Sequence, residues 1–123
     1  MLSAVKYQHQ NQLRQVAPAM PRGADMYPLH ISMLNNRGYI LSHDKARMAV
    51  DFQGNAMVVH WFAGDLRYIG KPIVQELLQF AKSQGAQKLF WKSDVMNQAT
   101  TQIYAQIGTL VNHDGQFLYW EAS

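Results

Sequence analysis

The chain has 123 residues and a mass of 14.1 kDa, with 48% hydrophobic and 15% charged residues, which is the size and composition of one compact globular domain. The absence of cysteine excludes disulfides, thiolate metal sites, iron–sulfur clusters and a cysteine nucleophile. The formal charge is +3, but the basic residues are spread singly along the chain, so a nucleic-acid partner is not favoured.

Apolar runs are short throughout the sequence. Residues 1–15 are interrupted by polar side chains, so no signal peptide is expected. The runs at 57–63 and 73–81 fall well below the roughly 18 residues that a membrane span needs. We therefore expect a soluble protein with no membrane partner and, by default, a cytoplasmic location.

The N-terminal third has the least regular pattern. Residues 1–20 fit either a helix, with apolar side chains from Leu2 to Val16 along one side, or a short strand over 2–7. A short helix is predicted over 27–34, ending at the polar cluster 35–38.

The middle of the chain changes to a period of two. A short strand is predicted over 39–41, followed by an alternating strand around 48–52 and a nearly continuous apolar strand over 57–62. Gly54 can adopt the positive φ of a tight turn, so the last two strands are predicted to form a hairpin.

A helix follows over 72–81, because apolar residues recur there at helical spacing, Pro72 suits a first turn and Gly85 suits a C-terminal cap. A short buried strand is predicted over 88–92. The strand–helix–strand crossover inside an otherwise antiparallel sheet predicts a mixed α+β fold.

The C-terminal part is predicted as a helix over 97–106 followed by a hairpin over 109–120 that turns at Asp114 and Gly115. The three tryptophans fall on predicted strands and are expected in the core rather than on a base-stacking surface.

One segment of this region resembles the GNAT acetyltransferase superfamily. Asn97, Thr100, Ile103, Tyr104 and Gly108 are similar to the family's sequence of Asn, a small residue three positions on, an aliphatic residue and Tyr, and Gly four positions after the Tyr. The resemblance covers about 47–120 and implies a GNAT-like mixed sheet with a C-terminal β-hairpin. It implies a single domain over 1–123, of which 1–38 is poorly defined.

The chain departs from the family pattern at two places. Thr109 stands where the family usually has an aromatic residue. In the segment that resembles the pyrophosphate loop, Gly70 matches the second glycine, but Tyr68 replaces the first and Asp65 replaces Gln or Arg. If Arg67 and Gly70 are matched to the pattern instead, Pro72 stands at its last position, where the family has Gly or Ala. Glycines in such a loop let backbone amides approach phosphates.

The resemblance implies acetyl-CoA as co-substrate and a small-molecule or protein amine as acceptor, and it leaves a homodimer open. The residues that it assigns to coenzyme binding are Phe62, Ala63, Leu66, Arg67, Tyr68, Ile69, Gly70, Lys71, Asn97 and Tyr104. No metal site is expected, because the remaining histidines lack the i, i+4 pairing of ligands.

Direct transfer from a thioester to an amine needs a base for the ammonium proton and an acid for the departing thiolate. Tyr104 matches the family's thiolate-protonating tyrosine, or is a core residue with a satisfied hydroxyl. His60 and Asp94 are the candidate bases. The alternatives are a hydrogen-bonded structural histidine and a cap for the helix that begins near Asn97.

Two hypotheses remain. The segment 97–108 and Gly70 favour an acetyl-CoA-dependent N-acyltransferase, which is preferred. Tyr68, Thr109 and the short N-terminal part favour a catalytically silent GNAT-fold binding or assembly protein. A fainter resemblance, in 107–108 and 114–117, is to the small GNAT-like internal virion proteins of short-tailed bacteriophages.

Overall fold

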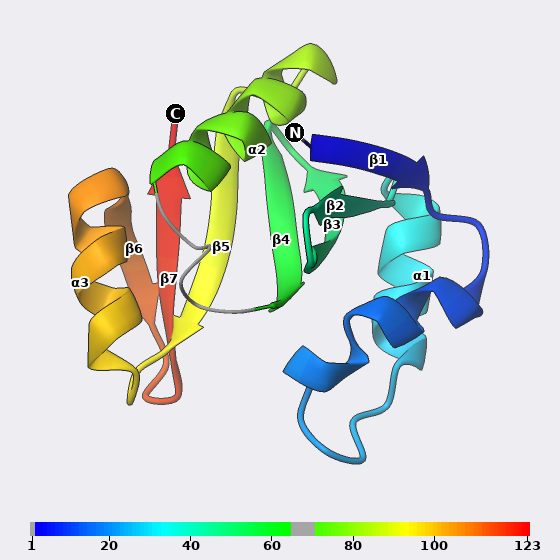
Figure 1. The fold of residues 1–123 in the computed structure, drawn as a ribbon, viewed down its shortest axis with the longest axis horizontal. Helices are drawn as coiled ribbons and strands as arrows, with labels where there is room; N and C mark the ends of the chain where they lie inside the picture. The colour runs from blue at the N-terminus through cyan, green and yellow to red at the C-terminus, as the bar shows by residue number, and fades with distance from the viewer. Residues whose placement is uncertain (1, 65–70) are drawn as a thin grey trace.

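The computed structural model describes residues 2–64 and 71–123 (Figure 1). Its elements in chain order are β1 (Leu2–Lys6), the 3-10 helices η1 (Gln10–Gln15) and η2 (Ala17–Ala19), α1 (Tyr27–Asn35), β2 (Tyr39–His43), β3 (Ala46–Gln53), β4 (Ala56–Ala63), α2 (Lys71–Ser83), β5 (Lys88–Asp94), α3 (Gln98–Ile107), β6 (Thr109–His113) and β7 (Phe117–Ala122).

The strands form one sheet in the order β1-β2-β3-β4-β5-β7-β6. Neighbouring strands run antiparallel except β4 and β5, which are parallel and joined by α2. This is the crossover predicted from the sequence, and the mixed α+β fold is confirmed. No helix in the described ranges is long and apolar enough to cross a membrane.

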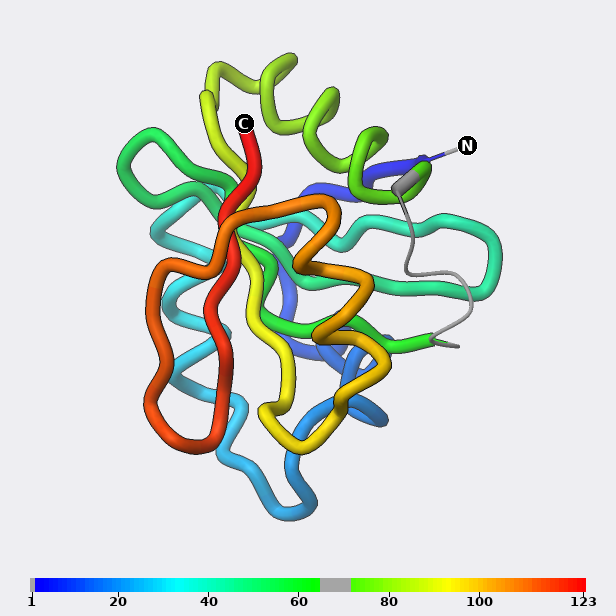
Figure 2. Tube along the Cα trace, turned by 90° about the vertical axis from the view of Figure 1, so that its left-hand side faces the viewer, coloured from blue at the N-terminus to red at the C-terminus, as the bar shows by residue number. Residues whose placement is uncertain are grey.

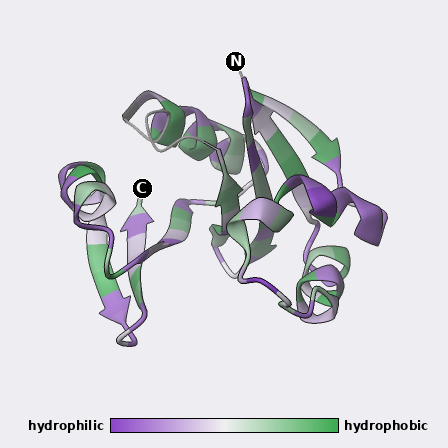
Figure 3. Ribbon diagram, turned by 60° about the horizontal axis from the view of Figure 1, so that its bottom comes forward, coloured by the Kyte–Doolittle hydropathy of each residue, from purple (hydrophilic) through white to green (hydrophobic). Residues whose placement is uncertain are grey.

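Each face of the sheet is covered by its own helices. The larger core lies under α2 and α3 and includes Met48 and Leu77, whereas the smaller one lies under α1 and η1 and includes Met33 and Ala49. Because consecutive strand residues point to opposite faces, Met48 and Ala49 place the two cores on opposite sides of β3. Figure 2 shows α1 and α3 on the two sides of the strands, and Figure 3 shows hydrophobic residues on strands and helices alike.

The sequence prediction differs from the structure in a few places. Of the two alternatives for the N-terminus, the strand is found, at the edge of the sheet. Phe90 was expected to be buried, but it is only partly covered, with its ring stacked on that of Tyr119 at a centroid distance of 5.9 Å. The hairpin turn at Gly54 has the predicted positive φ, 59°.

The strands β4 and β5 are paired over only part of their length. Their register joins Ala56–Val58 to Lys88–Phe90, yet β4 continues to Ala63 and β5 to Asp94. Beyond Val58 the two strands part, as Figure 1 shows. The backbone groups of β4 that face β5 therefore have no strand partner in this stretch.

A β-bulge in β4 lies next to this separation. Ala49 of β3 pairs with Trp61, but the next residue, Val50, pairs with Val59, so His60 is an extra residue without an opposite partner. Bulges redirect side chains and end regular pairing, often beside functional sites. Here the bulge brings His60 and Trp61 to the same region of the α1-side face.

Candidate functional site

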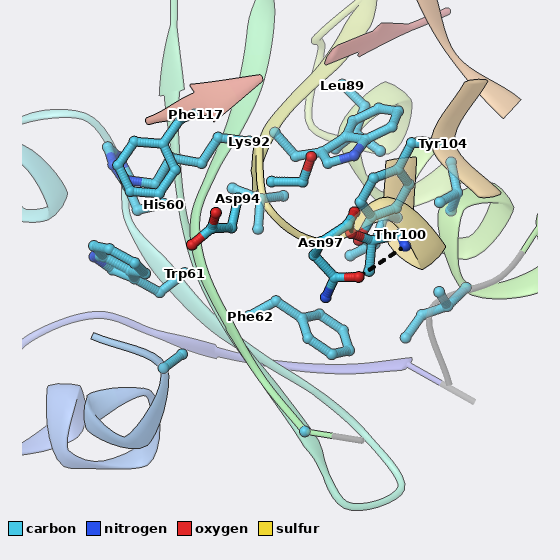
Figure 4. A pocket seen from close by; sticks show the side chains of 18 residues that line it. His60, Trp61, Phe62, Leu89, Lys92, Asp94, Asn97, Thr100, Tyr104 and Phe117 are labelled. Atoms are coloured by element: carbon cyan, nitrogen blue, oxygen red, sulfur yellow. Dashed lines mark hydrogen bonds between the residues drawn. The ribbon is translucent and has the colours of Figure 1, made fainter. Parts of the chain in front are cut away.

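A cavity of about 330 Å³ lies where β4 and β5 part (Figure 4). Residues from both faces of the sheet line it, and we call it the inter-strand cavity. On the α2 and α3 side the lining includes Ile73, Val74, Leu77, Asn97, Thr100 and Tyr104; on the α1 side it includes Ala19, His60, Trp61, Lys92, Asp94 and Phe117. Side chains from both faces of the sheet thus line one cavity at the point where β4 and β5 are no longer paired.

Tyr104 is held by aromatic packing, and its hydroxyl has no hydrogen-bond partner among the residues that the structure describes. Its ring lies edge-on to Trp91, at a centroid distance of 5.4 Å, and is tilted against Trp120 at 5.9 Å. The side chain is buried, and burial raises the pKa of its hydroxyl well above the ordinary value. Within the described part of the chain this hydroxyl makes no hydrogen bond. Tyr104 therefore offers a protonated donor to the cavity.

Asn97 is the N-cap of α3, because its Oδ1 accepts a hydrogen bond from the Thr100 amide at 3.1 Å. The N–H groups of its Nδ2 make no hydrogen bond to the described residues, and the side chain lies at the centre of the cavity lining (Figure 4). The role of helix cap that was considered for Asp94 therefore belongs to Asn97. Asp94 instead accepts from the Met96 amide at 2.8 Å in the turn before the helix, and its exposed carboxylate also lines the cavity.

His60 has a carboxylate behind it. Its Nε2 lies 2.9 Å from Asp51 Oδ2, which is close enough for an ion pair but bent from the line of a hydrogen bond. Asp51 is completely buried and also accepts from Ser32 Oγ at 2.5 Å and from Gln53 Nε2 at 3.0 Å. These bonds fix the carboxylate, and the carboxylate fixes one edge of the imidazole. His60 thus has the buried contact expected of a structural histidine, and it also lines the cavity, as a catalytic base would.

Lys92 reaches into the α1-side end of the cavity between two rings. Its Nζ lies 3.9 Å from the ring centroid of Trp61 and 4.6 Å from that of Phe117. Removal from water lowers the pKa of the Lys92 ammonium, and the charge of Asp114 opposes this shift. Trp61 is only partly buried, whereas Trp91 and Trp120 are core residues as expected.

Some predicted site residues do not line the cavity or cannot be placed. Phe62 lines it, but Ala63 packs against the smaller core under α1. The segment 66–70, which includes the predicted pyrophosphate contacts Leu66, Arg67, Tyr68, Ile69 and Gly70, lies outside the described residues. Lys71 is the first residue of α2. In the ranges that the structure describes, no three side chains are grouped as metal ligands would be.

Sequence reasoning missed three residues of the site. Asp51 was considered only as part of the alternating strand, and Lys92 only as one of the dispersed basic residues. Trp61 was expected in the core. A buried-looking Asp inside an apolar strand is itself a signal, because a buried carboxylate needs partners. No comparable signal marks Lys92, whose ring contacts come from β4 and β7.

Comparisons with known proteins identify the fold through structure alone. No protein-family model matches the sequence, and no curated protein is significantly similar to it. The structure is similar to a Bacillus subtilis acetyltransferase in complex with CoA, at 9% identity and a TM-score of 0.64, covering 99% of this chain and 97% of that one. An IAA acetyltransferase from Bacillus cereus matches at 11% identity and 0.63, with 99% of each chain covered.

The ribosomal-protein-S18-alanine N-acetyltransferase from Escherichia coli is also similar, at 12% identity and a TM-score of 0.62, over 99% of this chain and 93% of that one. Identities this low show the fold alone. The chain has the fold of the GNAT acetyltransferases, as the segment 97–108 predicted.

Proposed function

We propose that this protein is an acetyl-CoA-dependent N-acetyltransferase that transfers an acetyl group to an amine by direct attack. The inter-strand cavity is the observation that carries the proposal. Its lining includes Tyr104 on the α2 and α3 side and His60 and Asp94 on the α1 side. Groups from both faces of the sheet can therefore act on a thioester and an amine that are held in one cavity.

The cavity lining fits the pantetheine arm of acetyl-CoA, a narrow chain with two amide groups. Apolar side chains of α2, including Ile73 and Leu77, form one wall. The unpaired edge of β4 can hydrogen-bond an extended ligand as it would another strand. Trp91 Nε1 is a buried donor without a partner in the described chain, and Asn97 Nδ2 is another donor. Buried donors of this kind are costly unless a ligand completes them.

The pyrophosphate of the coenzyme is proposed to lie before helix α2. That helix begins at Lys71 and has 13 residues, so the amides of its first turn have no partner within the helix and its N-terminus carries a partial positive charge. The resemblance assigns Leu66–Lys71 to this role.

Tyr104 is proposed as the acid for the leaving group. Acetyl-CoA supplies the acyl group as a thioester, and breaking the C–S bond leaves a thiolate. The Tyr104 hydroxyl is protonated at neutral pH, as an ordinary phenol is, and burial raises its pKa further. It makes no hydrogen bond to residues 2–64 or 71–123, so it can donate to the sulfur without breaking a bond to these residues.

His60 is proposed as the base. When its Nε2 proton faces the Asp51 carboxylate, its Nδ1 is left as an acceptor for a proton from the bound ammonium, directly or through water. Asp51 is then a positioning residue. Asp94 is proposed to hold the ammonium by charge on the same side of the cavity.

The atoms balance over one turnover. An N–C bond forms between the amine and the acetyl carbon as the C–S bond breaks. The bound ammonium first loses one proton to His60, which passes it to solvent, and the neutral amine then attacks. As the amide forms, a second amine proton goes to His60, and Tyr104 gives one proton to the sulfur. Solvent deprotonates His60 and reprotonates Tyr104, so the products are an N-acetylated amine, free CoA and one released proton. The acceptor is proposed to be a primary amine of a small molecule or of a protein.

Release of CoA from acetyl-CoA in the presence of candidate amines tests this proposal. We expect Tyr104→Phe to lower kcat by about 100-fold with an acetyl-CoA affinity within about twofold of wild type, because the ring keeps its packing while the proton donor is lost. Tyr39→Phe is the matched control, since that partly buried hydroxyl contacts Gln84 at 3.4 Å and does not line the cavity.

The same measurement separates the two hypotheses. An enzyme binds acetyl-CoA and loses turnover in Tyr104→Phe but not in Tyr39→Phe. Failure of wild type to bind acetyl-CoA, measured by calorimetry, would support a silent GNAT-fold binding or assembly protein instead. If Tyr104→Phe binds acetyl-CoA and has full turnover, the protein is an enzyme, but Tyr104 is a core residue and not the acid.

A further inference from the structure

The α1-side end of the inter-strand cavity contains an ammonium group with no hydrogen-bond acceptor among the described residues. Lys92 Nζ contacts the faces of Trp61 and Phe117, and in the part of the chain that the structure describes it has neither a hydrogen bond nor a carboxylate at ion-pair distance. Ring faces attract a cation but take up none of its three N–H donors as a strong hydrogen bond would. An incoming anion could therefore bind this ammonium without displacing an internal partner.

The ammonium is also prepared for such an anion by its surroundings. The rings of Trp61 and Phe117 remove part of the Lys92 side chain from water, which is why its pKa is lowered. Asp114 acts on Lys92 only through space, and its own carboxylate accepts hydrogen bonds from Tyr119 and from two backbone amides. A charge that is held in place and partly desolvated binds an anion more strongly than a solvated surface lysine does.

A carboxylate lies next to this ammonium on the same strand. Lys92 and Asp94 are two residues apart on β5, so they point to the same face, about 6.6 Å apart along the strand. Both line the cavity, together with His60 across the opening (Figure 4). The acceptor side therefore offers one fixed positive and one fixed negative group at a short separation.

We propose that the acceptor is a small amine carrying a carboxylate close to its nitrogen, of the α-amino acid class, with Lys92 binding the carboxylate between Trp61 and Phe117. This inference rests on the proposed acetyltransferase function and names its substrate class. The two opposite charges of such a zwitterion match Lys92 and Asp94, and an amine held at Asp94 lies beside His60 at the opening between the strands.

Two further observations favour a small molecule. The cavity volume, about 330 Å³, is at the lower end of the range for ligand sites and must hold the thioester end as well as the acceptor. Trp61 and Phe117 form flat apolar walls beside the ammonium, which suits an acceptor with an aliphatic or aromatic side chain. Transfer to this amine follows the balanced scheme given above.

Binding of reaction products tests the inference without any turnover. The probes are N-acetyl-alanine, N-acetyl-leucine and N-acetyl-phenylalanine, each paired with the acetamide of its decarboxylated amine, titrated into the full chain and followed by NMR. For at least one pair we expect the carboxylate to improve affinity by about 10- to 100-fold in wild type, the size of a charge-assisted hydrogen bond.

The variants attribute that preference to one side chain. Lys92→Met keeps an unbranched side chain between the two rings and is expected to abolish the preference, whereas Lys92→Arg keeps the charge and should retain most of it. Lys88→Met is the matched control, because Lys88 lies on the same face of β5, ion-paired with Glu121 at 3.2 Å and away from the cavity. It should leave the preference unchanged.

The outcomes are distinct for the two proposals. No preference for a carboxylate in wild type, no detectable binding of any N-acetyl-amino acid, or a preference that survives in Lys92→Met would each overturn the inference, whatever the enzyme does with other amines. If the preference depends on Lys92 but no amino acid releases CoA from acetyl-CoA, the carboxylate subsite stands as a binding site and the assignment of amino acids as acetylation acceptors is wrong. The proposed function is then decided separately, by CoA release with the other candidate amines.

Discussion

Replacing Asp51 by asparagine separates orientation of His60 from the rest of the site. The carboxylate is fully buried, and its Oδ2 contacts both Ser32 Oγ and His60 Nε2, while Oδ1 accepts from Gln53 Nε2. An amide has the same shape but only one accepting oxygen. If its NH2 faces His60, it donates to Nε2 and leaves the proton on Nδ1, so the base has the wrong tautomer.

The expected magnitudes differ for stability and for activity. Asparagine loses the charge that strengthens the contacts with Ser32, Gln53 and His60, which should cost about 1–3 kcal/mol of the free energy of unfolding. A domain with ordinary stability of about 5–15 kcal/mol remains folded after this loss. General-base catalysis contributes about 100- to 10,000-fold, so kcat should fall by at least about 100-fold.

The assay is the release of CoA at saturating acetyl-CoA, together with acetyl-CoA affinity and urea unfolding. Ser32→Ala is the control, because it also removes a hydrogen bond to Asp51 but leaves the carboxylate facing His60; we expect similar destabilisation and kcat within about threefold. If Asp51 acts only through His60, Asp51→Asn adds no further loss in the His60→Gln background. Equal losses of activity in Asp51→Asn and Ser32→Ala, or full additivity with His60→Gln, would refute this role.

Three further predictions concern the elements around the cavity. Lys71→Glu should weaken acetyl-CoA binding about tenfold by calorimetry, although an acidic residue is favourable at the start of a helix. Lys82→Glu, in the last turn of the same helix, should change the affinity less than twofold. Equal affinities in the two variants would show that the helix N-terminus does not bind the coenzyme. The hydrogen bond from Tyr119 lowers the pKa of Asp114 most, and hydrogen bonds from two backbone amides lower it further. Asp114→Asn should therefore have a lower Tm than wild type above about pH 4, and the two Tm values should converge as the pH falls through the depressed pKa. A difference in Tm that persists in acid would contradict this. A Cβ added at Gly108 would lie 2.7 Å from the indole ring that β5 contributes to the cavity, so Gly108→Ala should cost about 1–3 kcal/mol in urea unfolding; an unchanged midpoint would show that the ring can move.

The elements with strong local signals were predictable from the sequence. Helix α3 was identified within one residue at each end, because its cap at Asn97 and its inward Tyr104 are set by neighbours only a few residues away. Helix α2 was likewise identified from the spacing of its apolar residues. The parallel pairing of β4 and β5 followed from the crossover rule and needed no long-range information.

The site was only half predictable, because its remaining parts depend on pairs that are distant in the sequence. Tyr104, Asn97 and Phe62 were placed by resemblance, and His60 and Asp94 by position, and all five line the cavity. The partner of His60 could not be predicted, since the bulge that turns it toward Asp51 is a property of the β3–β4 register. The sequence likewise gives no sign of the ring contacts of Lys92, which require β4, β5 and β7 to be side by side.

Amide NMR shifts of the full chain during titration with acetyl-CoA test the central claim most directly, which is that the unpaired edge of β4 binds the coenzyme. We expect saturable shifts in the amides of residues 59–63 and around Tyr104, with those of α1 nearly unchanged. Desulfo-CoA, which lacks the sulfur, should move the β4 amides but affect those around Tyr104 less. Saturation without any shift in residues 59–63, or no saturable shifts at all, would contradict the account.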